Sequence, residues 1–189
     1  FPPLRSLGAP GNLPAPTGPL VGRGAELTAV GALLTKDRAR LVTLSGPGGA
    51  GKTRLSITLA EEVAESFVDG VHFVDLSAAT DDAVAWRTLS ETLGRSNDTE
   101  TELLDHLRDR NVLLVLDNLE QLPASGAEVV TKLLRATTRM RLLATSRRPL
   151  HVMGEQEYPV PPLGLPAVER NAPTVEAASR AESVQLFVQ

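Results

Sequence analysis

Hydrophobic positions along the chain follow two patterns, short unbroken apolar runs and longer segments with apolar residues three or four positions apart. Unbroken runs are typical of strands buried on both faces, and the wider spacing is typical of amphipathic helices. The runs predict strands at residues 40–45, 71–76, 112–116 and 141–145, with a short fifth strand at 157–160. Because helical segments separate these strands, we expect an α/β fold with three layers, in which helices cover both faces of a five-stranded, mostly parallel sheet.

The helical spacing predicts one helix at about residues 23–35 and a second directly after the first strand. Leu55, Leu59, Val63 and Phe67 fall on one face of this second helix. Two shorter helical patterns lie between the second and third strands, and another precedes the fourth strand.

Segments rich in Pro and Gly divide the chain into three parts. Residues 1–20 lack periodicity and predict an extended linker, so that the folded domain would occupy residues 21–160. A second linker with the sequence PPLGLPAVERNAPT follows, and a helical pattern begins near Thr174. We therefore expect residues 161–189 to be a linker and the first helix of a truncated helical domain. Because the first residue is Phe1 rather than Met, we also expect a fragment of a longer chain.

Composition narrows the classes of partner. There are no cysteines, which excludes disulfides and thiolate metal sites, and the three histidines have no metal-ligand spacing. A net charge of −4 argues against direct nucleic-acid or anionic-membrane binding by this segment. No signal peptide or run long enough to span a bilayer is present in the sequence, so we expect a cytoplasmic domain.

Residues 46–53 read GPGGAGKT and match G-x-x-x-x-G-K-[ST] at every fixed position. The motif lies between a predicted strand and a predicted helix, where backbone N–H groups and the helix N-terminus can surround phosphate oxygens. Lys52 is expected to contact the outer phosphates and Thr53 to bind Mg²⁺. An incidental glycine-rich turn is the alternative. The context favours a P-loop nucleotide site, and its expected nucleotide-binding residues are Gly46, Gly48, Gly49, Ala50, Gly51, Lys52 and Thr53.

The third strand ends on Asp117, beside the first strand of the predicted sheet. Its carboxylate is expected to lie near Thr53 and to bind Mg²⁺, although an aspartate here can also simply cap a turn. The next residue, Asn118, is an amide and cannot take a proton from water. Glu120 lies three residues further and is expected to face solvent if the chain turns helical there. These residues favour tight binding with slow hydrolysis.

Ser146, Arg147 and Arg148 follow the fourth strand, at the edge of a parallel sheet where ligands bind. An arginine there can contact the terminal phosphate, and we favour Arg147 over Arg148. The alternative is a pair of solvated arginines. Lys52, Asp117 and Arg147 are thus the candidate catalytic residues.

The segments VGRGAEL, GPGGAGKTRL, LLVLDNLEQL, LLATSRRPL and PVPPLGLP, in this order, resemble the nucleotide-binding core of the STAND ATPases, the NB-ARC or AP-ATPase group. The resemblance spans residues 12–189. More specifically, these segments resemble the ATPase region of large bacterial transcriptional regulators of the antibiotic-regulatory and LuxR types. It implies that Val21, Gly22 and Arg23 lie near the adenine and ribose and that Arg147 senses the γ-phosphate. It further implies a switch between a closed ADP state and an open, often oligomeric ATP state, with effector, helical and winged-helix modules elsewhere in the chain.

The leading hypothesis is a regulatory domain that binds ATP or ADP with Mg²⁺ and hydrolyses ATP slowly. A small-molecule kinase is the main alternative, although the sequence shows no lid of arginines. A GTPase is disfavoured because no Asn-Lys-x-Asp motif occurs, and a ring-forming motor because no glutamate follows Asp117. A purely structural nucleotide site stays open.

Overall fold

The computed structural model describes residues 11–15, 20, 22–37, 39–122 and 126–162. The described elements, in chain order, are α1 (Gly24–Thr35), β1 (Leu41–Ser45), α2 (Lys52–Val63), the 3₁₀ helix η1 (Ala64–Ser66), β2 (Val71–Asp75), α3 (Asp82–Thr92), α4 (Glu100–Leu107), β3 (Leu113–Asp117), the 3₁₀ helix η2 (Leu119–Gln121), α5 (Gly126–Ala136), β4 (Arg141–Ser146) and β5 (Glu155–Pro159). Within this part of the chain, no helix is both long and apolar enough to cross a membrane.

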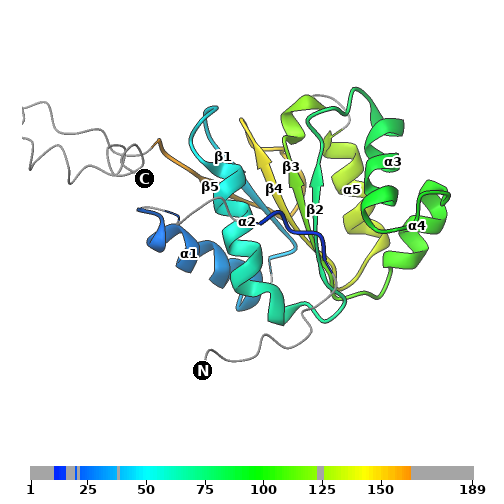
Figure 1. Cartoon of the computed structure of the whole chain (residues 1–189), viewed down its shortest axis with the longest axis horizontal. Helices are drawn as coiled ribbons and strands as arrows, with labels where there is room; N and C mark the ends of the chain where they lie inside the picture. The colour runs from blue at the N-terminus through cyan, green and yellow to red at the C-terminus, as the bar shows by residue number, and fades with distance from the viewer. Residues whose placement is uncertain (1–10, 16–19, 21, 38, 123–125, 163–189) are drawn as a thin grey trace, which may run out of the picture.

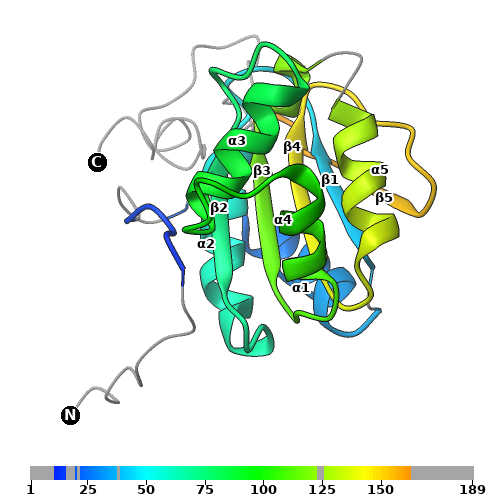
Figure 2. The same cartoon turned by 90° about the vertical axis from the view of Figure 1, so that its right-hand side faces the viewer.

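The five strands form one sheet in the order β2-β3-β4-β1-β5, and every pairing is parallel. The helices form a layer on each side of the sheet: α1 and α2 cover one face, and α3, α4 and α5 cover the other (Figures 1 and 2). The predicted three-layer α/β fold is therefore confirmed.

The central strands are apolar because alternate residues enter two different cores. In β3, Leu113 and Val115 pack with α1 and α2, whereas Leu114 and Leu116 pack with α3, α4 and α5. Side chains alternate between the faces of a strand, so a strand covered on both faces needs an unbroken apolar run. This requirement explains why the sequence pattern located β3 well.

The fifth strand differs from its prediction. It was expected at residues 157–160 and instead runs over Glu155–Pro159. It lies at the edge of the sheet beside β1, and its side chains are exposed or half-buried. An edge strand needs no unbroken apolar run, so the hydrophobic pattern could not define its start.

The segment before the predicted domain contacts the edge of the sheet. Gly11, inside the predicted N-terminal linker, forms a parallel bridge with Val71 of β2. The side chain of Asn12 pairs with the backbone of Phe73, donating to its carbonyl at 2.8 Å and accepting from its N–H at 2.7 Å. The predicted linker thus contacts the sheet edge at these residues. The helix expected near Thr174 lies outside the described residues.

Gly46 fixes how β1 enters the phosphate loop. The N–H of Val160, directly after β5, donates to the carbonyl of Ser45 at 2.7 Å. A Cβ on Gly46 would lie 2.5 Å from the carbonyl oxygen of Val160, and the residue has a φ of +149°. Only glycine meets both conditions without displacing the end of β5.

Gly46→Ala is expected to lower the free energy of unfolding by about 2 kcal/mol or more, because the added methyl group overlaps backbone and the backbone conformation is strained. Urea unfolding of the nucleotide-free chain would measure this change. Gly24→Ala, at the start of α1 where a Cβ meets nothing within 4 Å, is the matched control. It should change stability by less than about 1 kcal/mol, and equal losses from both substitutions would contradict the assignment.

Candidate functional site

The carboxyl ends of the parallel strands meet at one edge of the sheet, and the predicted site residues gather there. β1 leads into the loop of residues 46–51, and β3 and β4 end at Asp117 and Ser146. The register pairs Ser45 with Ser146 and Asp75 with Asp117 across neighbouring strands. Crevices at this edge are the usual ligand sites of open parallel sheets.

The phosphate loop curls in front of the N-terminus of α2. Gly49 and Gly51 have positive φ values of 78° and 83°, and a Cβ on either would meet nothing within 4 Å. The ammonium group of Lys52 donates to the carbonyls of Gly46 at 2.8 Å and Pro47 at 2.9 Å. The loop therefore presents open backbone and the positive end of a helix, with Lys52 closing the loop on itself.

The carboxylate of Asp117 lies against the start of α2, as the sequence predicted. The hydroxyl of Thr53 lies 2.9 Å and 3.0 Å from its two oxygens. The hydroxyl of Thr145, on β4, donates to one of them at 2.5 Å. Asp117 is only 3% exposed, so these hydrogen bonds offset part of the cost of removing a carboxylate from water.

Burial nevertheless dominates the electrostatics of this group. It raises the pKa of Asp117 above its ordinary value, and the neighbouring carboxylates of Asp75 and Glu120 raise it further, against the hydrogen bonds from Thr145 and Thr53. No basic side chain contributes to the pKa of Asp117. A cation beside this carboxylate would favour its charged form and so offset the cost of its burial.

Asn118 directly follows Asp117, at the position where an acidic residue could activate water. Its backbone is left-handed, with φ 62° and ψ 39°, a conformation that Asn adopts more readily than most residues. Its amide donates to Asp75 at 3.2 Å and to Asp117 at 3.0 Å, and its N–H donates to the Thr145 hydroxyl. Asn118 therefore organises the carboxylates at the strand ends and leaves no base at this position.

Glu120 does not face solvent, so that prediction was wrong. The chain does turn helical, as η2, but one oxygen of Glu120 lies 3.4 Å from Nε of Arg147. The other is a buried atom without a hydrogen-bond partner in the structure, and the side chain is 20% exposed. The guanidinium of Arg147 also borders the phosphate loop, since a Cβ on Gly48 would lie 4.0 Å from its Nη2. Arg147 is thus placed between a carboxylate and the loop.

Arg23 has an unexpected role for its side chain. It is 5% exposed and donates to the carbonyl of Ala50 at 3.1 Å and to that of Pro161 at 2.6 Å, while pairing with Glu26 at 2.7 Å. The guanidinium joins the phosphate loop to the segment after β5. Gly22 precedes it with a positive φ of 70°, and Val21 lies outside the described residues.

The residues present fit a nucleotide with Mg²⁺. The open glycine backbone suits phosphate oxygens, and Lys52 and Arg147 supply positive charge at its border. Among the described residues, no three His, Asp or Glu side chains are grouped to hold a metal on their own. Magnesium is commonly bound by one or two carboxylates together with substrate phosphates, which matches Thr53 and Asp117 beside the loop.

A family model described as an AAA domain matches residues 35–157. The chain belongs to this AAA domain family. The match includes the phosphate loop, Asp117 and Arg147, and it makes the chain a P-loop ATPase domain.

Relatives of this AAA domain are much longer proteins. A Mycobacterium tuberculosis protein provisionally named an HTH-type transcriptional regulator is 39% identical over 138 residues, which are 71% of this chain and 15% of that protein. Regulatory protein AfsR of Streptomyces griseus is 31% identical over 153 residues, which are 73% of this chain and 15% of AfsR. The chain thus spans a small part of each regulator.

Solved structures show the same fold. The Drosophila ORC bound to DNA has a TM-score of 0.60 at 16% identity, over 74% of this chain and 42% of that one. Cdc6p from Pyrobaculum aerophilum has a TM-score of 0.55 at 18% identity, over 82% and 47% of the two chains.

Sequence reasoning missed three contributors to the AAA domain site: Asp75, Thr145 and the side chain of Arg23. Asp75 ends its strand just as Asp117 does, so a comparison of strand ends could have found it. Thr145 depends on the register of β4 against β3, and no local signal pointed to it. The side chain of Arg23 reaches Pro161, 138 positions away.

Asp117→Asn is expected to stabilise the chain at pH 7 without magnesium, because the amide avoids the cost of a buried charge. The folded-state pKa of Asp117 is raised, so the folded state binds more protons than the unfolded state between the two pKa values. The wild type therefore regains stability as the pH falls through the raised pKa, and the advantage of Asp117→Asn should shrink. Urea unfolding of both chains in EDTA across this pH range checks the trend, and a constant difference would refute it.

Proposed function

We propose that this domain is a regulatory ATP switch of the STAND type, which binds ATP or ADP with Mg²⁺ and hydrolyses ATP slowly. The observation that carries the proposal is the position of Arg147 between Glu120 and the phosphate loop. A switch requires ATP and ADP to favour different states, and an arginine that contacts only the γ-phosphate supplies such a difference.

The guanidinium of Arg147 has two alternative partners in the proposed switch, the carboxylate of Glu120 and the γ-phosphate of ATP. Without a γ-phosphate, Arg147 stays near Glu120 at 3.4 Å. With one, the phosphate oxygens compete for the same group. Arg147 is 65% exposed, so the pair itself contributes little to stability and can be broken readily. This weak pairing suits a reversible sensor.

Slow hydrolysis follows from the residues around Asp117. Asn118 cannot act as a general base, and its amide is bonded to Asp75 and Asp117. Glu120 is the nearest further carboxylate in sequence, but it lies against Arg147. Lys52 and Arg147 would contact the phosphates, and Thr53 and Asp117 would hold the metal, which supplies charge neutralisation when bound.

The proposed partners are other domains of a longer chain. The relatives named as transcriptional regulators are far longer than the matched region, which supports effector and helical modules outside it. We extend the proposal to a cytoplasmic protein that forms an ATP-dependent oligomer and whose nucleotide-binding domain does not itself contact DNA. Gly22 and Arg23 would lie at the adenine and ribose through backbone contacts, with Val21 beside them.

One observation favours the alternative of a small-molecule kinase. A hollow of about 400 Å³ adjoins the site and is bordered by Glu120, Ser146, Arg147, Arg148 and His151. Its size suits a small acceptor, and the arginines suit a negatively charged one. Kinase activity would require transfer of the γ-phosphate to such an acceptor rather than to water.

The deciding experiment is single-turnover hydrolysis of radiolabelled ATP with magnesium, with Lys52→Ala as the blank. We expect Lys52→Ala to lose ATP binding and the unsubstituted chain to hydrolyse bound ATP more slowly than about 10⁻² per second, as in P-loop sites without an activating group. Lys36→Ala, an exposed lysine outside the site, should bind like the unsubstituted chain. Turnover within seconds would overturn the slow switch, and label transfer to added metabolites would favour the kinase.

Arg147→Ala is expected to lower the ratio of ATP to ADP affinity roughly fivefold or more, because a charged hydrogen bond to the γ-phosphate is lost. Glu120→Gln should raise the same ratio, since it removes the competing carboxylate. Competition titrations with a fluorescent nucleotide give both affinities. Arg148→Ala is the matched control and should leave the ratio within about twofold. An unchanged ratio in Arg147→Ala would remove the sensor assignment.

A further inference from the structure

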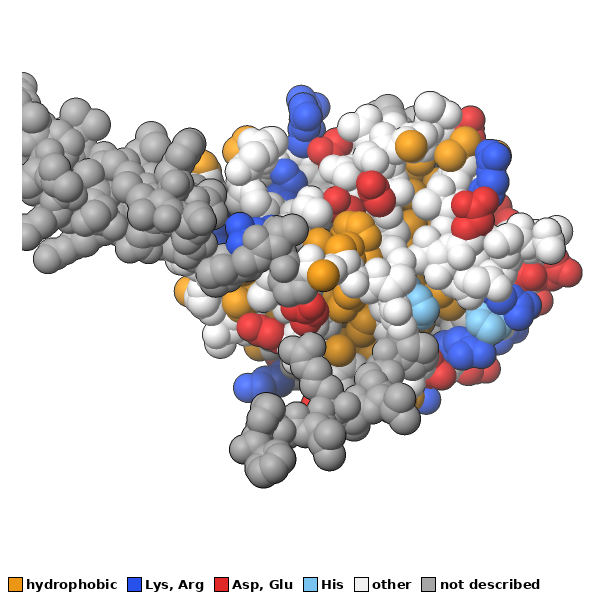
Figure 3. All heavy atoms as spheres, in the orientation of Figure 1, with side chains coloured by type: hydrophobic (Ala, Val, Ile, Leu, Met, Phe, Trp, Pro, Cys, Tyr) orange, Lys and Arg blue, Asp and Glu red, His pale blue; other side chains and the backbone are white. Residues whose placement is uncertain are grey.

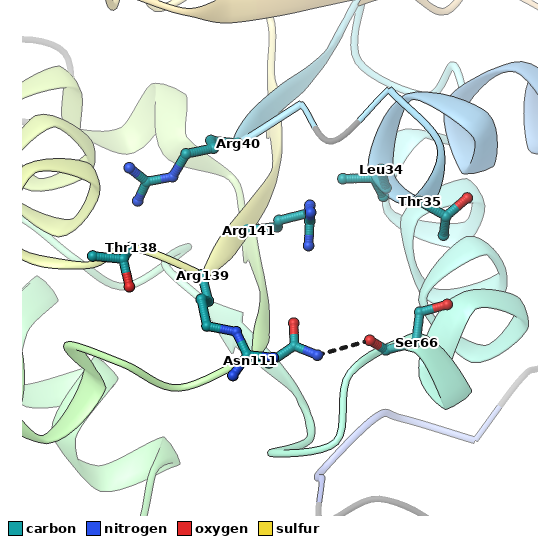
Figure 4. Close-up of a pocket in the computed structure, with 8 residues that line it drawn as sticks. All are labelled: Leu34, Thr35, Arg40, Ser66, Asn111, Thr138, Arg139 and Arg141. Atoms are coloured by element: carbon teal, nitrogen blue, oxygen red, sulfur yellow. Dashed lines mark hydrogen bonds between the residues drawn. The ribbon is translucent and has the colours of Figure 1, made fainter.

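A second hollow lies at the opposite end of the sheet, where the strands begin. Its volume is about 430 Å³, which is within the usual range for small-molecule sites. Arg40 directly precedes β1, Arg141 is the first residue of β4, and Arg139 lies two residues before it (Figure 4). None of the eight residues that line the hollow is acidic.

This concentration of one charge is unusual for the domain. On the face shown in Figure 3, basic and acidic side chains are interspersed. The whole chain has a net charge of −4, yet the hollow gathers three guanidinium groups. One carboxylate contacts a lining residue: Asp69 accepts from the N–H of Asn111 and pairs with Arg110 at 3.6 Å.

The strand register places two of these arginines at neighbouring positions of the sheet. Leu41 of β1 pairs with Leu142 of β4, and Arg40 and Arg141 directly precede this pair. Their side chains extend in different directions (Figure 4). Arg40 is half-buried, and this burial lowers the pKa of its guanidinium.

The groups around the charges are donors of the kind that bind oxyanions. Arg40 has a buried Nε without a hydrogen-bond partner in the structure, while its Nη2 donates to Thr137 at 2.8 Å and 2.9 Å. Arg139 is exposed and forms no ion pair within the described residues. The hydroxyl groups of Thr35, Ser66 and Thr138 and the amide of Asn111 complete the polar lining. Two of these groups also hold the lining in place, since Asn111 donates to the carbonyl of Ser66 at 2.9 Å and Thr138 to that of Arg108 at 3.3 Å. Arginine forks together with hydroxyl and amide donors match the several acceptor oxygens of a phosphate group.

The packing beneath the hollow holds one arginine in place. Leu34, near the end of α1, borders the hollow and is fully buried, and the guanidinium carbon of Arg141 lies 5.8 Å from the centre of the buried Phe67 ring. We propose that this hollow is a second ligand site, which binds a phosphorylated small molecule at the end of the sheet opposite the phosphate loop.

The test is a titration of isotopically labelled chain with inorganic pyrophosphate, followed by NMR shifts of backbone amides. Lys52→Ala is used to remove phosphate binding at the loop. In the unsubstituted chain, the positions of the shifted amides distinguish binding at the loop from binding at the hollow. We expect saturable shifts at Asn111 and at residues 138–141 in both chains. Their persistence in Lys52→Ala distinguishes this proposal from the proposed function, which concerns residues 46–53.

Arg139→Ala is expected to weaken pyrophosphate binding at the hollow by about fivefold or more, because it removes a charged donor. The exposed Arg135, which does not line the hollow, gives the matched control: Arg135→Ala removes the same charge and should leave the affinity within about twofold. If both substitutions weakened binding equally, the loss of affinity would be explained by the change in net charge alone, and the proposal would be overturned. Shifts confined to the phosphate loop, or no saturable shifts at millimolar pyrophosphate, would also overturn it. If an acidic peptide saturates the hollow and pyrophosphate does not, the ligand is a protein segment and the proposed ligand class is wrong.

Discussion

The buried carboxylate of Asp117 is the interaction on which the nucleotide end of the fold depends. It receives hydrogen bonds from the first turn of α2 and from β4, so it joins the end of β3 to two elements that are distant in sequence, and it also accepts from the adjacent Asn118. Hydroxyl and amide donors satisfy its oxygens but do not balance its charge, and burial still raises its pKa. The domain therefore carries an electrostatic cost at the point where a cation would bind, a cost that active sites commonly retain for function.

Much of the fold and part of the site were readable from the sequence, for identifiable reasons. The strands β1, β3 and β4 are buried on both faces, so their apolar runs locate them, and the phosphate motif determines Lys52 and Thr53 by spacing. The edge strand β5 lacks such a run, and its start was predicted two residues late.

The missed contacts depend on long-range geometry. Which hydroxyl of β4 meets Asp117 depends on strand register, and periodicity does not determine register between distant strands. The orientation of Glu120 depends on η2 and on the return of the chain at Arg147. The side chain of Arg23 depends on where the chain arrives after β5. Local patterns identify which residues are polar, but they do not identify their partners.

Asn118 illustrates how backbone geometry and chemistry coincide. The chain must reverse sharply after β3 to begin η2, and a left-handed residue makes that reversal. Asparagine tolerates this conformation and provides an amide that fits between two carboxylates. The same residue that shapes the turn thus places an amide, which cannot act as a base, directly after Asp117.

The strand order also affects the order in which contacts form during folding. β1 is the first of the described strands in sequence, but its neighbours in the sheet are β4 and β5, the last two of them. The contacts that position the phosphate loop, from Val160 to Ser45 and from Arg23 to Pro161, join residues separated by more than a hundred positions. Such non-local pairings form late, because the loop-closure entropy must be overcome first. The phosphate loop therefore reaches its final position only after the segment that follows β5 has joined the sheet.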